Sequence, residues 1–240
     1  MNTNIYHTVN AGLFFQTPKG GILVDGLHDG CELGFSNMPA SLQEQLENHS
    51  GIFANTDTVL FTHLHPDHYS LEKLELLHEK KPDLQIYGPG IKHNNIKEEV
   101  LSKTVHLLRL PSCEVLIKNT IHDGEAWKDD WNQSFLIRIG SEQYFIAGDT
   151  KLDVEDAQEF LPFVSGPLQY GFFNLYQLNS DEGRAFIQNM PFEKIGLYHL
   201  PLKQDDIFHY RQLARQLLRN IPDGLPPLKI LNHLDWLNNN

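Results

Sequence analysis

The chain has 240 residues, 40% of them hydrophobic, so it can bury a core and form one large domain or two small ones. Its 31 acidic and 19 basic residues give a formal net charge of −12, which argues against the basic surface of a nucleic-acid-binding protein. The two cysteines are too few for a disulfide framework, and no apolar stretch approaches the length of a membrane span.

The N-terminal part of the chain predicts a β-hairpin. Residues 1–10 lack the basic start and apolar run of a signal peptide, so we expect a cytoplasmic protein with reduced thiols. Strands are predicted at 13–15 and 21–24, joined by a turn-rich segment. The second strand ends at Asp25. An acid in this place is either a cap for the turn or a carboxylate that orients a metal-bound histidine.

Residues 26–40 predict a loop that is rich in glycine and other breakers of regular structure. Ordered loops of this length often carry functional residues. His28 in this loop either faces a substrate or is an ordinary half-buried histidine. Cys31 has a similar position, but nothing in the sequence lowers the pKa of its thiol, so a plain structural cysteine is the leading interpretation.

The densest group of chemically active residues is Thr-His-Leu-His-Pro-Asp-His at 62–68. The run 58–61 before it is apolar and β-branched, which predicts a buried strand. Ser70 can cap a helix predicted over 70–80, where leucines return at helical spacing. The motif is therefore expected on a tight loop between a strand and a helix.

The spacing within this motif favours two metal ions. His63 and His65 are two residues apart, so in an extended segment their side chains point the same way and can reach one ion. Pro66 stiffens the turn that follows. Beyond it, Asp67 and His68 can face a second ion. Imidazole and carboxylate ligands suit zinc, iron or manganese.

The rest of the chain predicts alternating strands and helices, with no repeat, linker or change of composition, so we predict a single domain over residues 1–240. Residues 162–177 are predicted to be irregular. Further strands are predicted at 85–87, 105–108, 114–121, 134–139, 143–147, 195–198 and 228–231, and helices at 41–48, 91–102, 152–161, 181–188 and 206–218.

Three more possible ligands follow predicted strands directly. His122 and His199 each come after an apolar run, and Asp149 stands between a glycine and a threonine at the end of another. Strand ends that share one edge of a sheet can converge, as ligand sites do in layered α/β folds. We therefore expect these side chains to lie near the histidine motif.

The order of these motifs resembles the metallo-β-lactamase superfamily over essentially the whole chain. The residues that carry the resemblance are the motif at 62–68, a later lone histidine, Gly-Asp-Thr at 148–150 and a final histidine after a strand. The resemblance implies an α/β (α+β) fold, a four-layer αββα sandwich with metal ions at one edge between the sheets.

The resemblance also implies two divalent metal ions, zinc or alternatively manganese or iron. The last ligand is assigned to His199, because His209 lies in a helix-like run and His233 follows a weaker strand. The implied ligands are His63, His65 and His122 for the first ion, Asp67, His68 and His199 for the second, and Asp149 as a bridge between them.

His122 lies further from Asp149 than the corresponding histidine does in many members of the superfamily. Longer spacing is similar to the branch that contains ascorbate-6-phosphate lactonase and N-acyl-phosphatidylethanolamine phospholipase D. His122 has no nearby rival, because no other histidine occurs between it and Asp149. The alternative assignment is His106.

These ligands predict a hydrolase that uses a metal-bridging hydroxide to cleave an ester, lactone or phosphodiester bond of a small molecule or lipid-derived substrate. Asp67 or Asp149 could take up the proton. β-Lactamases of the superfamily commonly have a cysteine in the second site, and flavodiiron-type oxidoreductases a glutamate where His65 stands, so we expect neither activity. The alternative is a non-catalytic binding or regulatory protein stabilised by its metals. The oligomeric state stays open.

The loops 26–40 and 162–177 are expected to shape the substrate pocket with their large side chains. Each of these side chains could instead be part of the core, where aromatic residues contribute most of the packing. The residues concerned are Phe35, Met38, Tyr170, Phe172, Phe173 and Tyr176.

Overall fold

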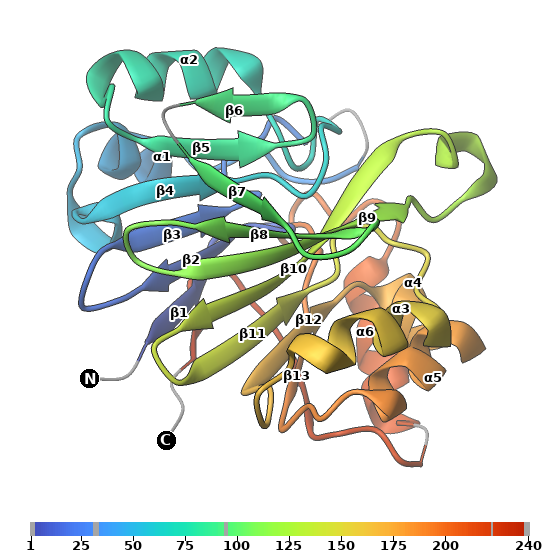
Figure 1. The fold of residues 1–240 in the computed structure, drawn as a ribbon. Coiled ribbons are helices and arrows are strands. Elements are labelled where there is room, and N and C mark those ends of the chain that lie inside the picture. Colours follow the sequence, from blue (N-terminus) through green and yellow to red (C-terminus); the bar gives the residue numbers. More distant parts are fainter. Residues whose placement is uncertain (1–2, 31–33, 94–95, 222, 238–240) are drawn as a thin grey trace.

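The structure, a computed structural model, describes residues 3–30, 34–93, 96–221 and 223–237. Within these ranges the chain forms two mixed β-sheets that pack face to face. Helices cover the outer face of each sheet, so the layers run helix, sheet, sheet, helix (Figure 1). The αββα sandwich predicted from the sequence is thus confirmed. Cys31 lies outside the described residues.

The first sheet joins the N-terminal strands to the strand that precedes the histidine motif. Its β3–β4 and β4–β5 pairs are parallel and its other pairs antiparallel. Helices α1 (Ala40–Glu47) and α2 (Leu71–Lys80) pack on its outer face. The spatial order is β15 (Trp236–Leu237), β1 (Asn4–His7), β2 (Leu13–Gln16), β3 (Gly21–Val24), β4 (Thr56–Leu60), β5 (Gln85–Gly88) and β6 (Ile91–His93).

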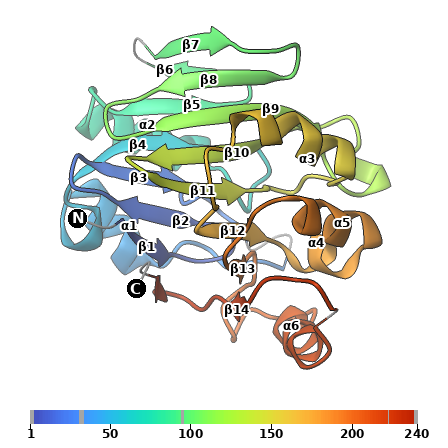
Figure 2. The ribbon, with the colours of Figure 1, turned by 60° about the horizontal axis from the view of Figure 1, so that its bottom comes forward.

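The second sheet is antiparallel from β7 to β11 and parallel from β11 to β14. Its helices lie on the side away from α1 and α2 (Figures 1 and 2). The spatial order is β14 (Leu228–Ile230), β13 (Ile195–Leu197), β12 (Tyr170–Phe173), β11 (Glu142–Ile146), β10 (Trp131–Ile139), β9 (Glu114–Ile121), β8 (Val105–Arg109) and β7 (Lys97–Val100). The helices are α3 (Val154–Phe160), α4 (Leu175–Asn179), α5 (Asp181–Asn189) and α6 (Tyr210–Arg219), and short 3₁₀ turns occupy Gly51–Phe53, Glu125–Trp127 and Leu161–Phe163.

Alternate residues of the central strands enter different cores, as the two-residue period of a β-strand requires. On β2, Phe15 packs between the two sheets, whereas Phe14 packs with the residues of α1 and α2. On β11, Tyr144 faces the first sheet and Phe145 contacts Phe186 of α5 on the other side. These strands are apolar on both faces because both faces are buried.

The helix predicted over 91–102 is wrong. Most described residues of this stretch belong to β6 and β7, which lie at the edges of the two sheets, and none of them is helical. Gly90 has a φ of 71°, a conformation that suits glycine and lets the chain turn from β5 back into β6. β7 is exposed along its whole length, and its charged residues suit an edge strand that should not pair further.

The stretch 162–177, predicted to be irregular, contains the central strand β12 and the helix α4, so that prediction is also wrong. β12 is buried throughout and pairs in parallel with β11 and β13. A Cβ at Gly171 would come within 2.5 Å of Phe173 and 2.7 Å of Phe192. The glycine therefore makes room for two aromatic rings and does not interrupt the strand.

Smaller differences concern the chain ends and one helix. The strands β1 and β15 were not predicted, and they pair with each other across the ends of the chain. The helix expected from residue 206 begins at Tyr210, because the Asp206 carboxylate accepts hydrogen bonds from the backbone N–H groups of Tyr210 and Arg211. In the described part of the chain, no helix is both long and apolar enough to cross a membrane.

Candidate metal centre

Seven side chains that can bind a metal come from four loops, each of which follows a strand. The loop after β4 carries four of them. A tight turn keeps these four close together, and in it the His68 backbone N–H donates to the His65 carbonyl oxygen at an N···O distance of 2.9 Å. Strand ends on one edge of the sandwich bring the four loops together. The seven are His63, His65, Asp67 and His68 after β4, His122 after β9, Asp149 after β11 and His199 after β13.

Asp25, at the end of β3, holds the loop after β4 in place. Its φ of 49° lies in the left-handed region, which aspartate tolerates better than most residues. Thr62 donates to its carboxylate twice, from the backbone N–H at 2.8 Å and from the hydroxyl at 2.7 Å. His68 Nδ1 donates to the same carboxylate at 3.0 Å. Of the two roles considered for Asp25, these contacts support the carboxylate that orients a histidine.

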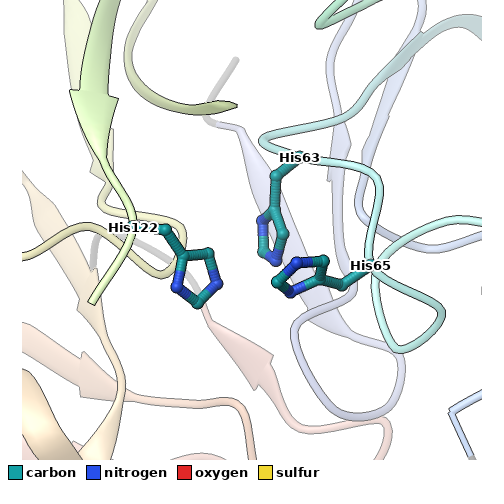
Figure 3. A group of neighbouring side chains, drawn as sticks. All are labelled: His63, His65 and His122. Carbon is teal, nitrogen blue, oxygen red and sulfur yellow. The ribbon is translucent and has the colours of Figure 1, made fainter. Parts of the chain in front are cut away.

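The first group of possible ligands consists of His63, His65 and His122. One ligand atom from each lies within 4.8 Å of the others. Figure 3 shows the three rings directed toward one another, His63 and His65 from the loop after β4 and His122 from the loop after β9. His122 Nδ1 donates to the carbonyl oxygen of Asp123 at 2.6 Å, which leaves Nε2 available. Three imidazoles in this arrangement are a donor set that zinc accepts with a further position open.

The second group consists of Asp67, His68, Asp149 and His199, whose ligand atoms also lie within 4.8 Å of one another. The Nε2 atoms of His68 and His199 are 3.2 Å apart. Oδ2 of Asp67 lies 2.9 Å from His199 Nε2 and 3.8 Å from His68 Nε2. Two imidazoles and two carboxylates thus meet within the span of one coordination sphere.

Asp149 lies between the two groups. Its Oδ2 is 4.0 Å from His63 Nε2, 3.8 Å from His122 Nε2 and 3.6 Å from His68 Nε2. Asn174 donates from Nδ2 to the other oxygen, Oδ1, at 3.0 Å, which sets the direction of the carboxylate. A carboxylate oxygen shared in this way can contact ions in both groups.

Three polar atoms in these groups are buried and have no hydrogen-bond partner among the described residues. They are His63 Nε2, His122 Nε2 and Asp67 Oδ1. Buried polar atoms are almost always paired, because an unpaired one loses its hydration without compensation. A cation bound to these lone pairs would satisfy them. The residues present therefore fit metal ions.

Several solved structures share this architecture. CmlA, a diiron β-hydroxylase from Streptomyces venezuelae, matches with a TM-score of 0.65 and 14% identity over 99% of this chain and 54% of its own. Igni18, a metallo hydrolase from Ignicoccus hospitalis, matches at 0.63 and 13% over 99% and 98%. YhfI from Bacillus subtilis, a metallo-β-lactamase fold protein, matches at 0.59 and 16% over 99% and 100%.

This chain has the metallo-β-lactamase fold. It spans about half the length of CmlA, 54%, and nearly all of Igni18 and YhfI. Comparison of the sequence with protein-family models and with curated proteins gives no match. The likeness is therefore one of fold, and the activity has to be argued from the side chains that the metallo-β-lactamase fold brings together.

Burial keeps two histidines of the first group, His63 and His122, in the neutral form. It lowers the pKa of His63 well below the usual 6.5, and it also lowers the pKa of His122. Both imidazoles are therefore neutral near pH 7 and offer a lone pair, which is the form that binds a metal. At His63 and His122, a cation therefore does not have to displace a competing proton.

The second group is different. Burial alone would lower the pKa of His68, but the carboxylates around it, with Asp25 and Asp67 the strongest, raise it well above 6.5. Burial alone would raise the pKa of Asp149, but His199 and His68 lower it well below 3.8. Without a metal, His68 holds a proton between carboxylates. A cation that binds here must displace that proton.

On acidification, the second group is expected to lose its ion at a higher pH than the first. Proton competition for His68 begins as the pH falls through its raised pKa, whereas His63 stays neutral well below pH 6.5. In the metal-free protein, acidification has the opposite effect on the stability of the fold. The protonated His68 stabilises the fold at a pH below the pKa that this histidine has in the unfolded chain, and this contribution is lost as the pH rises through the raised pKa of the folded protein. Metal content after desalting at stepwise lower pH measures the order of release, and loss from the first group before the second would contradict it.

Asp25→Asn is expected to weaken binding of an ion at the second group by about 10–100-fold, the usual cost of losing a partner that orients a ligand. The amide keeps the size of the carboxylate, but it cannot accept hydrogen bonds at both oxygens from Thr62 and His68. Titration of the metal-free protein with zinc measures the effect. Asp57→Asn is the matched control, a half-buried carboxyl that pairs with Thr58 and Ser112 instead. Equal zinc affinity in the two variants would refute the orienting role.

The rival histidines lie apart from both groups. His106 on β8, the alternative to His122, has its Nδ1 2.9 Å from Oε1 of Glu98 on the edge strand β7. His209 has a φ of 60° and precedes α6, and His233 contacts the Thr8 carbonyl oxygen. The structure therefore brings together the preferred histidines and none of these three.

His28 is completely buried and does not line the cavity over the ligands. Its Nδ1 lies 3.4 Å from Asn10 Nδ2, which donates to it. Burial lowers its pKa to about 3, so the ring is neutral. Of the two roles considered for His28, the structure supports a histidine of the core, although one more deeply buried than expected.

A cavity of about 330 Å³ opens over the two groups. Phe35 and Tyr176 line it, as expected from the loops that carry them. For the other large residues of these loops the alternative of core packing holds, because their side chains point from strands or packed segments into the cores. They are Met38, Tyr170, Phe172 and Phe173.

Five further lining residues were not predicted: Asp123, Gly124, Trp127, Asn174 and Tyr210. Asn174 follows β12 just as the ligands follow their strands, so a correct assignment of β12 would have suggested it. Asp123 follows His122 directly and could have been considered. Trp127 and Tyr210 have no signal in the sequence, because nothing local shows that the 3₁₀ turn and the start of α6 border the same cavity.

Proposed function

We propose that this protein is a metal-dependent hydrolase that binds two divalent ions and cleaves an ester, lactone or phosphodiester bond of a small-molecule or lipid-derived substrate. One observation carries the proposal. Buried ligand atoms without partners converge at the base of a cavity large enough for a small substrate. A purely structural zinc site needs four ligands and is closed to water, whereas here seven ligands lie beside an opening.

The ligand roles follow the two groups. Two bound cations would supply a water molecule of lowered pKa and positive charge to stabilise the developing negative charge on the substrate. In the proposal, His63, His65 and His122 would hold the first ion, Asp67, His68 and His199 would hold the second, and Asp149 would serve as a ligand to both.

The chain's own groups orient the ligands and receive the proton. Asn174 keeps one oxygen of Asp149 occupied, so its other oxygen is directed at the two groups. Asp67 binds His199 through Oδ2 and keeps Oδ1 free of any partner among the described residues. We propose that Asp67 or Asp149 takes up the proton from the attacking water and that these two residues are catalytic.

Zinc is the proposed metal, with manganese or iron as alternatives. Five imidazoles and two carboxylates form a donor set of the kind that zinc accepts. CmlA, which shares the fold, is described as a diiron enzyme, so iron stays in the proposal. Elemental analysis of protein purified without added metal distinguishes these ions.

Other parts of the sequence-based prediction stay predictions. They are the resemblance to the branch of ascorbate-6-phosphate lactonase and N-acyl-phosphatidylethanolamine phospholipase D, the single domain, and the cytoplasmic location. The net charge of −12 supports a partner other than nucleic acid.

The test combines metal analysis with a substrate screen. The metal-free protein is reloaded with zinc, manganese or iron, and generic esters, lactones and phosphodiesters are assayed with each. We expect two ions per chain and turnover of at least one bond class. One ion per chain, with no exchangeable water and no turnover, would favour the non-catalytic binding protein instead.

A further inference from the structure

One wall of the cavity is a stack of three rings. The Phe35 ring lies 4.3 Å from that of His199, at 22° to it, and 5.7 Å from the Tyr210 ring, at 9°. Phe35 comes from the loop before α1 and Tyr210 from the start of α6, so distant segments build the stack. The wall presents flat, apolar surface beside the second group of ligands.

Trp127 forms another wall of the same cavity. Its ring lies 4.8 Å from that of His65 and 6.4 Å from that of His122, so it borders the first group. The residue is 44% exposed, so part of its ring is accessible to a ligand. A flat group that enters the cavity can contact aromatic surface next to either ion position.

The cavity is expected to bind poorly any negatively charged group of a substrate that lies away from the scissile bond. None of the described residues that line it is lysine or arginine, and Asp123 adds a carboxylate outside the two ligand groups. The nearby Lys128 pairs with Glu125 and Lys73 pairs with Asp29. An anionic group held away from the ions would lose hydration without finding a charged donor.

We propose that the cavity selects substrates with an uncharged aromatic group next to the scissile bond, that Trp127 is a specificity-determining residue, and that a second anionic group away from the reacting centre is rejected. This inference rests on the proposed hydrolase function for its kinetic test but not for its binding test. It narrows the substrate class from any small ester, lactone or phosphodiester to those that carry an uncharged aryl group beside the bond that is cleaved.

The kinetic test uses three substrates that share the bond class found active in the screen and the same small leaving group. They differ only in the distal group, which is methyl, benzyl or 4-sulfonatobenzyl. A sulfonate is chosen because it is a weak metal ligand. We expect kcat/KM for the benzyl substrate to exceed that for each of the others by about tenfold or more, the size of discrimination that a missing or mismatched pocket contact produces.

Variants assign the effect to the cavity walls. Trp127→Ala should remove the benzyl preference over methyl while both ions stay bound. Trp131→Ala is the matched control, because Trp131 ends the same hairpin loop, is 73% exposed and does not line this cavity. Tyr176→Arg, at a lining position that is 58% exposed, should raise kcat/KM for the sulfonated substrate by about tenfold by supplying the absent cation.

A binding test needs no turnover. Calorimetry of the metal-loaded protein compares phenylacetamide with 4-sulfonatophenylacetamide, and we expect at least a tenfold weaker affinity for the sulfonated amide. Equal affinities, or a benzyl preference that survives Trp127→Ala, would overturn the inference. If no bond class is hydrolysed but phenylacetamide binds selectively, the hydrolase function fails and the inference about the cavity stands.

Discussion

Replacing Asp149 by alanine is expected to remove both metal ions and to lower turnover on the order of 10³-fold or more, the loss seen when a group that organises charge is removed from an active site. Its Oδ2 lies within 4.0 Å of His63 and 3.6 Å of His68, which belong to different groups. No other carboxylate contacts both groups among the described residues. Without the Asp149 carboxylate, each group loses a negative charge that would attract its cation.

The measurement is metal content per chain after desalting, with activity on the substrate found in the screen. Asp123→Ala is the matched control, since Asp123 lines the same cavity but its carboxylate belongs to neither group. It should keep both ions. Thermal unfolding of the metal-free forms shows whether each variant still folds. Two ions per chain in Asp149→Ala would refute the bridging role.

The second large effect is expected for His122→Ala. This substitution removes one of three imidazoles from the first group and should weaken binding there by more than about a hundredfold, because losing a ligand exceeds the 10–100-fold cost of losing a supporting partner. The second group contains none of the atoms removed, so its ion should remain.

His106→Ala is the control for this prediction, because His106 was the alternative ligand and pairs instead with Glu98 on the edge strand β7. Zinc titration of both variants should show one weakened site in His122→Ala and none in His106→Ala. If the His106 variant loses an ion and the His122 variant keeps two, the assignment of the first group is wrong.

The secondary structure was predictable where the pattern is local. The apolar run 58–61 and Ser70 gave β4 and a capped α2, because strand burial and helix capping depend on neighbouring residues. The segment 91–102 was misjudged, since pairing with β5 and β8 overrides the helical tendency of its polar residues. β12 was missed because its glycine seemed a breaker, although Gly171 serves the packing of aromatic rings from elsewhere in the chain.

The sequence predicted the seven ligands of the candidate centre but not the residues around them. Seven histidine and aspartate ligands, in the order that resembles the metallo-β-lactamase superfamily, pointed to the same positions that the structure brings together. Asp25 was suggested as one of two possibilities, and only its contacts with Thr62 and His68 decided between them. Asn174 and Trp127 were not suggested, because their roles depend on which loops border one cavity.

The sequence by itself determined the chemistry available: imidazoles and carboxylates at strand ends, a net negative charge and a chain that alternates strands with helices. These properties are local or compositional, so the order of residues is enough to reveal them. Only the tertiary structure decided that His122, Asp149 and His199 meet the loop after β4. It also decided that aromatic rings from α6 and from the 3₁₀ turn at Glu125–Trp127 line the cavity. The physical reason is that the lateral order of strands in two stacked sheets is set by packing between residues far apart in the chain, which no local period records.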